Sequence, residues 1–409
     1  MKNKALISYA FLAVPLAFIG LPIYIYLPDF YNQNFDISLQ EIALILLVVR
    51  IFDALQDPAI GLLSDKFFKS RRKIIALSCP FLGVAVYFLF SPLVFLDSKI
   101  SLMISLFLTY LFFSIIWINH QALAVSLTEN RALKTTIIAY RESFFIIGII
   151  LASLLPAILE NYFSAKKSFE IIGVFYVFFI CICGAVFYKY VKTDFGLKNE
   201  NSLKLSKIFQ PKLRHFFAIF LFNSIASSIP ASLITFYVAQ VLNLKSQTGL
   251  FLILYFLGLI LGIIFWTKLS QKLKNKSKTW VISSIVTVII FPFCFFLREG
   301  DFIYYAAICL ISGFGFAGDF CLSYSILGDI ICDQKLEGKE STIFSITNFL
   351  VKISFTISSV VLIYLLGTIR EQGSNEIGFL SYSYAVLPCF FKIISTFLLF
   401  NFFKKYEKN

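Results

Sequence analysis

The sequence predicts an all-α membrane protein whose twelve transmembrane helices form two six-helix bundles. Of the 409 residues, 59% are hydrophobic and 14% are charged. Soluble domains average about 45–50% apolar and about 25% charged residues. Apolar runs of the length that a bilayer requires, about 20 helical residues, recur from one end of the chain to the other.

Twelve apolar segments meet this length requirement. They cover residues 5–27, 40–64, 74–95, 101–127, 136–159, 168–188, 215–241, 246–267, 279–297, 302–328, 342–366 and 379–402. The first segment follows Met-Lys-Asn-Lys without a small-residue cleavage site after it. We therefore expect a first transmembrane helix there, and not a cleaved signal peptide.

A long polar connection near the middle of the chain separates two sets of six segments. The predicted organisation is an N-terminal bundle over 1–190, a cytoplasmic loop over 191–213 and a C-terminal bundle over 214–409. The basic loops 63–73 and 269–278 are weakly similar, which favours two related halves with a substrate site between them, as in many secondary transporters. Chance similarity between two basic loops is the alternative.

The distribution of Lys and Arg predicts the orientation. If both termini lie on one side, that side collects 26 of the 36 basic residues, the other side collects 6, and 4 lie within helices. Basic loops mark the cytoplasmic face, so both termini are expected there. The bilayer thus explains the net charge of +13 better than a nucleic-acid partner does.

Cysteine and histidine patterns offer no cofactor site. The eight cysteines are scattered, mostly within apolar segments, without a CxxC pair, and there are only two histidines. We expect these cysteines to be small apolar helix residues, with no cofactor and no metal beyond a coupling ion.

The second predicted helix carries three charges on one face. Arg50, Asp53 and Asp57 are spaced i, i+3 and i+7, which aligns them along a helix. Each charge at bilayer depth costs about 2.5–3.5 kcal/mol on insertion scales, so the three must face the bundle interior or a wet cavity. Two carboxylates at i, i+4 suit a small cation or a titrating proton. A purely structural ion pair is the alternative.

Further polar groups are predicted within the membrane segments. They are Ser114, Asn119, His120, Gln121, Arg141, Glu142, Asn223, Asp319, Asn348 and Lys352. Asn348 and Lys352 share a helix face at i, i+4. His120 is expected to be a hydrogen-bonded packing residue, Glu142 and Asp319 to face away from the substrate, and Lys392 to snorkel or to serve a structural role.

The spacing Asp-x-x-x-Asp raises an enzyme of a different class, an intramembrane prenyltransferase that binds diphosphate through Mg²⁺. Such chemistry needs two acidic clusters, and the second candidate, Asp329 with Asp333, falls at a helix end. Twelve spans are also more than this enzyme needs. We therefore do not expect an enzyme.

Two motifs resemble a known family. Gly61-x-x-x-Asp65-Lys66 followed by Arg71-Arg72 is similar to a cytoplasmic loop motif of the major facilitator superfamily. The longer stretch from Arg50 to Gly61, with Asp53 and Asp57-Pro58, resembles the second helix of the glycoside–pentoside–hexuronide:cation symporters, the melibiose permease group. The resemblance covers most of the chain.

This resemblance implies roles for individual residues. Asp53 and Asp57 would bind Na⁺, Li⁺ or H⁺, with Ser114 as a further ligand, and Arg50 would couple that site to the substrate. Arg141 and Lys352 fall where the family has cationic sugar-site residues. Asp65, Arg71 and Arg72 would form a cytoplasmic gate, for which a simple positive-inside role is the alternative.

The departures from the family concern the sugar. Ala17 and Trp117 replace two sugar-binding aspartates, and Gln121 replaces a stacking aromatic residue. With Asn348, Trp117 and Gln121 are nevertheless expected to line the substrate site. Because Arg50, Arg141 and Lys352 outnumber Asp53 and Asp57, the expected substrate is anionic or strongly hydrogen-bond accepting.

The predicted function is therefore cation-coupled symport, by alternating access, of a small polar solute that is sugar-like or an organic acid. A lipid or lysolipid carrier of the same superfamily is the main alternative, and a non-transporting sensor is another. The expected location is the bacterial cytoplasmic (inner) membrane. The expected partners are membrane lipid and a small-molecule substrate, with no nucleic acid, and the expected state is a monomer.

Overall fold

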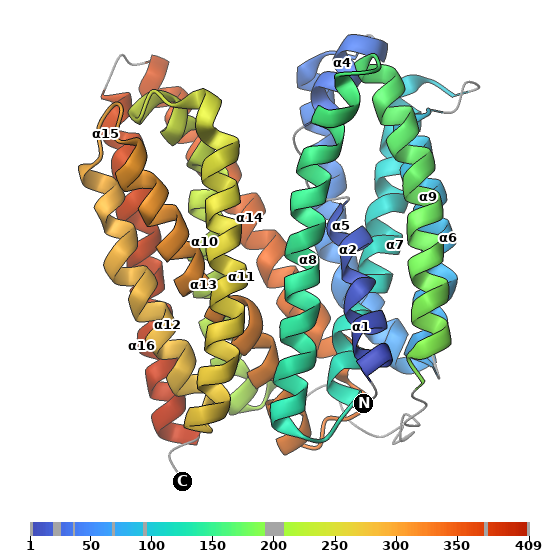
Figure 1. Ribbon diagram of the computed structural model, residues 1–409, viewed down its shortest axis with the longest axis vertical. Helices are drawn as coiled ribbons and strands as arrows, with labels where there is room; N and C mark the ends of the chain where they lie inside the picture. The colour runs from blue at the N-terminus through green and yellow to red at the C-terminus, as the bar shows by residue number, and fades with distance from the viewer. Residues whose placement is uncertain are drawn as a thin grey trace. The chain divides into compact units, whose positions relative to one another are not determined.

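The computed structural model describes residues 3–18, 26–35, 37–67, 70–92, 96–192, 208–371 and 375–406. Every regular element within these ranges is helical, as the sequence predicts (Figure 1). Ten helices in the described part of the chain are long and apolar enough to cross a membrane.

The two remaining predicted segments differ from these ten. Within 5–27, helix α1 (Asn3–Phe11) and helix α2 (Ala13–Phe18) are interrupted at Leu12, and residues 19–25 lie outside the described ranges. Helix α5 (Leu39–Phe67) has 29 residues, but it carries more charged side chains in its middle than the ten apolar helices do. The count of twelve and the cytoplasmic location of both termini stay predictions.

The contacts divide the chain into two compact units. Unit 1 comprises Met1–Asn201 and Lys335–Phe349, and unit 2 comprises Ser202–Gln334 and Leu350–Asn409. Helix α14 (Glu340–Glu371) therefore belongs to unit 1 in its first turns and to unit 2 from Leu350 onward. Most of the predicted central loop, 193–207, lies outside the described residues, and the predicted boundaries at 190 and 214 stay predictions.

Unit 1 contains most of the predicted site. Besides α1, α2, α5 and the start of α14, its helices are α4 (Leu27–Phe35), α6 (Arg71–Phe90), α7 (Ser98–Ser126), α8 (Arg131–Glu160) and α9 (Ala165–Tyr190). Helix α6 packs against both α7 and α9, α5 packs against α7, and α2 packs against α8. The short helix α4 is not among the predicted segments, because its nine residues are too few and too polar to cross a membrane.

Polar caps extend the helices of unit 1 beyond their apolar windows. The Asp97 side chain accepts a hydrogen bond from the Lys99 N–H (2.9 Å) at the start of α7, and the Asn130 side chain accepts one from the Ala132 N–H (2.9 Å) at the start of α8. The first N–H groups of a helix have no partner within the helix, so a capping oxygen stabilises the added turn. Hydropathy alone therefore places these helix starts too late.

Unit 2 contains the remaining α-helices. They are α10 (Pro211–Phe236), α11 (Thr248–Leu273), α12 (Lys276–Ile290), α13 (Phe302–Asp333), the later turns of α14, α15 (Glu376–Ser381) and α16 (Leu387–Tyr406). Helix α13 packs against α11 and α12, and α16 packs against α10 and α12. A π-helical turn, Tyr382–Val386, joins α15 to α16.

Glycines bring α11 and α13 into backbone contact. A Cβ atom added at Gly258 would lie 2.1 Å from the Leu310 carbonyl oxygen, and one added at Gly313 would lie 2.2 Å from the Tyr255 carbonyl oxygen. Small residues permit such close approach. The van der Waals contacts that result drive helix association in a membrane, where the hydrophobic effect does not favour contact with a helix over contact with lipid.

We expect Gly258→Ala to lower the free energy of unfolding by about 1–3 kcal/mol, because overpacking at a backbone contact forces the helices apart. Gly249→Ala is the matched control, since no atom lies within 4 Å of the Cβ it would add to the first turn of α11. Equal stabilities of the two variants, measured by unfolding in mixed micelles, would contradict this role of Gly258.

Candidate functional site

The two predicted cation-binding carboxylates are buried on α5. Asp57 is fully buried and Asp53 is nearly so. The Ser114 hydroxyl on α7 donates a hydrogen bond to Asp53 Oδ1 at 3.2 Å, and the Gln56 amide donates to the same oxygen at 3.2 Å. The structure thus brings Ser114 to Asp53, and it places oxygen atoms of two helices next to each other. Arg50, one turn before Asp53, is half-buried.

The predicted substrate residue Arg141 lies in a fully buried ion pair with its neighbour Glu142 on α8. Arg141 Nε donates to Glu142 Oε1 at 3.0 Å, and Arg141 Nη2 contacts the same oxygen. Sequence neighbours on a helix do not normally face each other, so both side chains must bend toward one another to meet. The Arg141 guanidinium also lies over the Trp117 ring, 5.4 Å from its centroid, where a cation–π interaction stabilises it.

Two amide side chains, Gln121 and Asn348, form a hydrogen bond one helical turn along α7 from Trp117. The Asn348 amide on α14 donates to Gln121 Oε1 on α7 at 2.8 Å, and both residues are buried. The Gln121 amide nitrogen has no hydrogen-bond partner among the described residues, and it can therefore donate to a solute. Lys352, one turn after Asn348, is half-buried and belongs to unit 2.

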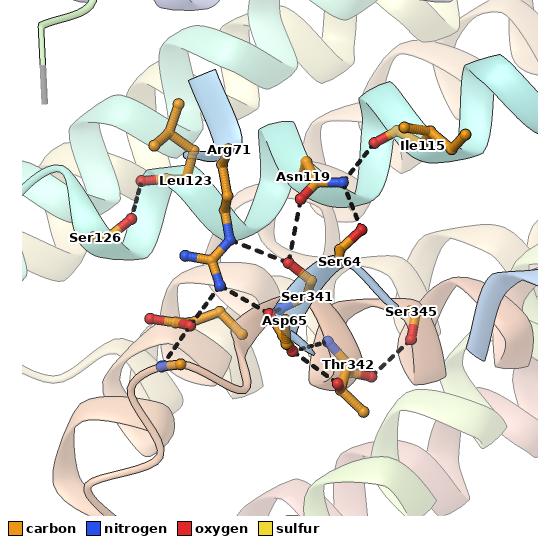
Figure 2. Close-up of polar contacts among 12 residues, drawn as sticks. Ser64, Asp65, Arg71, Ile115, Asn119, Leu123, Ser126, Ser341, Thr342 and Ser345 are labelled. Atoms are coloured by element: carbon orange, nitrogen blue, oxygen red, sulfur yellow. Dashed lines mark hydrogen bonds and ion pairs between the residues drawn. The ribbon is translucent and has the colours of Figure 1, made fainter. Parts of the chain in front are cut away.

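The predicted gate residue Arg71 lies at the centre of a buried polar cluster. Its Nη2 binds Asp65 Oδ1 at 2.8 Å and Glu340 Oε2 at 2.7 Å, and all three side chains are at most 4% exposed. Its Nε donates to the Ser341 hydroxyl at 3.1 Å (Figure 2). One guanidinium thus joins the end of α5, the start of α6 and the start of α14.

Asp65 also caps helix α14. Its Oδ1 accepts from the Ser341 N–H at 3.1 Å, and its Oδ2 accepts from the Thr342 N–H and hydroxyl, both at 2.7 Å (Figure 2). A carboxylate at a helix N-terminus satisfies free N–H groups and interacts favourably with the helix dipole. Asp65 therefore stabilises the first turn of α14 from a different helix.

Asn119 and Ser64 complete the contact. Asn119 Nδ2 on α7 donates to the Ser64 hydroxyl at 2.9 Å, and Asn119 Oδ1 accepts from the Ser341 hydroxyl at 3.4 Å (Figure 2). Gly61 allows this approach, since an added Cβ would lie 2.2 Å from Ser345 Oγ. The Arg71 cluster, as used below, consists of Ser64, Asp65, Arg71, Asn119, Glu340, Ser341 and Thr342.

The side chain of Arg72 contacts other residues than that of Arg71 does. It donates to the Val191 carbonyl oxygen at 3.3 Å, and its guanidinium lies 4.4 Å from the centroid of the Tyr188 ring. The structure therefore does not bring Arg72 into the Arg71 cluster with which the sequence groups it.

Three other expectations about polar residues have structural outcomes. Lys392 does not snorkel, because its ammonium is buried against Asp319 and Asn223 within unit 2. Of the second Asp-x-x-x-Asp pair, Asp329 pairs with Lys276 and Asp333 pairs with Lys212. His120 Nε2 lies 2.9 Å from the Tyr9 carbonyl oxygen, as expected of a packing residue.

A family model described as MFS/sugar transport protein matches residues 8–404, nearly the whole chain. The chain belongs to this family. Its predicted membership of the major facilitator superfamily is confirmed, and as a member of a transporter family it is a multi-pass membrane protein and not an enzyme. The prenyltransferase alternative is therefore wrong.

One relative of this MFS/sugar transport protein is itself described as a symporter. An uncharacterized symporter, YnaJ, of Bacillus subtilis (strain 168) is 28% identical over 235 residues, which cover 52% of this chain and 50% of the relative. The chain thus matches about half the length of that relative.

Solved structures of the same fold cover nearly the whole chain. A bacterial homologue of the iron transporter ferroportin in its outward-facing state has a TM-score of 0.75 at 14% identity, and covers 98% of this chain and 99% of its own. The Escherichia coli fucose:proton symporter FucP has a TM-score of 0.73 at 15% identity, and covers 98% of both chains. At these identities the similarity establishes the fold.

Sequence reasoning missed Glu142 and Glu340 as site residues. Glu142 follows Arg141 directly, a spacing that argues against pairing on a helix, and only side-chain geometry shows the contact. The signal for Glu340 was present, because an acidic residue at a helix start next to a Ser-Thr pair is typical of a capped N-terminus.

Proposed function

We propose that this MFS/sugar transport protein is a cation-coupled symporter, driven by Na⁺ or H⁺, for a small polar solute that is sugar-like or an organic acid. The hydrogen bond of 3.2 Å from Ser114 to Asp53, with Asp57 fully buried one turn further along α5, carries this proposal. Buried carboxylates are costly unless a cation or proton compensates them, and hard oxygen ligands suit Na⁺ and Li⁺.

The solute binds through the polar groups of unit 1. Arg141 supplies positive charge, Trp117 a ring face, and Gln121 and Asn348 amide groups. The substrate role of Lys352, one turn after Asn348 on α14, stays a prediction. Arg50 couples the solute to the cation, because it lies one turn from Asp53. This set favours an anionic or hydrogen-bond-accepting solute.

Alternating access completes the proposed cycle. The Arg71 cluster acts as the cytoplasmic gate. The predicted gate role of Arg72, which contacts Tyr188 outside this cluster, stays a prediction. We also propose that the chain spans the membrane twelve times, with both termini in the cytoplasm of a bacterial cell. The proposed state is a monomer without a cofactor.

A binding panel tests the substrate class. The purified full chain in detergent is heated with and without D-glucuronate, D-galactose and lysophosphatidylcholine, each with Na⁺ present. A ligand that binds only the folded state raises the unfolding temperature. We expect stabilisation by the uronate. Stabilisation by the lysolipid alone would favour the lipid-carrier alternative, and stabilisation by galactose alone would exclude an anionic substrate.

We expect Glu142→Gln to tighten uronate binding about tenfold, which corresponds to about 1.4 kcal/mol. The reason is that Glu142 occupies Arg141, and the neutral amide competes less with a solute carboxylate. Titration of the unfolding temperature with D-glucuronate measures the change. Glu170→Gln is the control, since the Lys167–Glu170 pair on α9 is exposed and such pairs contribute little. Weaker binding to Glu142→Gln would contradict the competition.

A further inference from the structure

Unit 2 contains a buried charge pair that the proposed cation site does not use. Lys392 on α16 contacts Asp319 Oδ2 on α13, and both side chains are at most 6% exposed. Lys392 Nζ also donates to Asn223 Oδ1 on α10 at 2.6 Å, and the Trp280 indole N–H on α12 donates to Asp319 Oδ1. Four helices thus each contribute one member of the Lys392 cluster: Asn223, Trp280, Asp319 and Lys392.

Stability alone does not explain this pair. Removing two charges from water costs several kcal/mol per ion, and well-packed apolar residues of similar volume are often as stable or more stable. Ionisable residues within a membrane segment are by default candidates for a functional role, proton transfer among them. The Lys392 cluster is a candidate of this kind, because Asp319 lies near the middle of the apolar span Phe302–Asp333 and Lys392 near the middle of the apolar span Glu376–Tyr406.

Each charge in the Lys392 cluster has a second, neutral partner. If Asp319 takes up a proton, its Oδ1 still accepts from Trp280, and Lys392 still donates to Asn223. Each of the two groups therefore keeps one hydrogen-bond partner when the ion pair opens. These neutral partners satisfy both groups in the paired state, and they stay available to both groups when the pair opens.

The groups around the pair leave Asp319 as the proton acceptor. Helices α10 and α12 face it with Asn223 and Trp280, which do not titrate in the physiological range. Among the described residues, the other titratable groups that interact with the pair are the Tyr255 phenol on α11 and the Cys389 thiol on α16. Both are neutral in their ordinary form at neutral pH.

We propose that Asp319 is a proton-binding site of unit 2, separate from Asp53 and Asp57 in unit 1. Proton uptake converts the Asp319 carboxylate to a neutral carboxyl group, and the Lys392 ammonium keeps its positive charge and its hydrogen bond to Asn223. Unit 2 then carries one more positive charge, and the direct link between α13 and α16 opens. This inference uses other residues than the proposed cation site, so either can fail alone.

Trp280 provides a built-in reporter for the test. The chain has three tryptophans, so the double variant Trp117→Phe/Trp266→Phe leaves Trp280 as the single indole. Its emission is followed in the purified full chain from mildly acidic to mildly alkaline pH. We expect one sigmoidal change, its loss in Asp319→Asn, and its retention in Asp57→Asn.

A constant Trp280 emission over this range would overturn the proposal, as would a transition that persists unchanged in Asp319→Asn. Asn imitates the neutral, protonated state of Asp319: it keeps an acceptor for Trp280, and Lys392 keeps its hydrogen bond to Asn223. Asp319→Asn/Lys392→Met removes both charges and serves as the second reference. A pH transition in that folded double variant would also contradict the assignment.

Discussion

Asp57→Asn will unfold at the same temperature with and without Na⁺ or Li⁺, whereas the unaltered protein will be stabilised selectively by one of them or will respond to pH. Asp57 is fully buried on α5, one turn from Asp53, and an amide cannot supply the charge that a bound cation needs. A ligand that binds only the folded state stabilises it by about 2.7 kcal/mol at about a hundredfold excess over Kd. The whole of this stabilisation should disappear.

The measurement compares Na⁺, Li⁺ and K⁺ at mildly acidic and mildly alkaline pH in detergent. Asp97→Asn is the matched control, because it makes the same change of charge at an exposed helix cap where Asn serves equally well. If Asp57→Asn keeps the full cation response, the assignment is wrong. If the unaltered protein responds neither to cations nor to pH, the two carboxylates are structural, and a uniporter or lipid carrier is favoured.

Arg71→Ala will lower the free energy of unfolding by about 3–5 kcal/mol, the usual cost of removing one partner from a buried ion pair. The side chains of Asp65 and Glu340 are at most 4% exposed and would lose the guanidinium that compensates both of them. Ser341 would also lose a donor at 3.1 Å. Unfolding in mixed micelles measures the loss.

Arg72→Ala is the internal control for Arg71→Ala. Arg72 is the next residue on α6 and carries the same charge, but it contacts Val191 and Tyr188 outside the Arg71 cluster. Its replacement should cost about 1 kcal/mol or less, as is usual for partly solvated polar contacts. Equal losses in the two variants would show that the Arg71 cluster contributes nothing beyond the basic character of the loop.

The prediction of the fold rested mainly on hydropathy, that is, on the positions of the apolar segments. A bilayer leaves few solutions for an apolar chain of this length, because each backbone polar group in lipid must be satisfied within a helix. The positions of the ten apolar helices therefore agree with the predicted segments to within several residues. Several helices start earlier than predicted, since caps such as Asp97 and Asn130 depend on side-chain hydrogen bonds that hydropathy does not measure.

The sequence also identified, by helical periodicity and by charge within apolar segments, which residues of this MFS/sugar transport protein carry the polar interior. Asp53, Asp57 and Arg141 stand out in this way, because a charge at bilayer depth is too costly to be placed there without a partner. Periodicity assigns residues to a helix face, but it does not identify the residue that approaches from another helix.

Those partners are a property of the tertiary structure. Ser114 approaches Asp53 from 61 residues away, and Glu340 approaches Arg71 from 269 residues away. Lys392 was expected to snorkel or to serve a structural role, and only the packing of α10, α13 and α16 shows that its partners are Asp319 and Asn223. The sequence by itself determined a membrane-embedded helical transporter and its costly charges, because those follow from local composition. Only the tertiary structure decided which charges compensate one another, because that depends on contacts between helices distant in the chain.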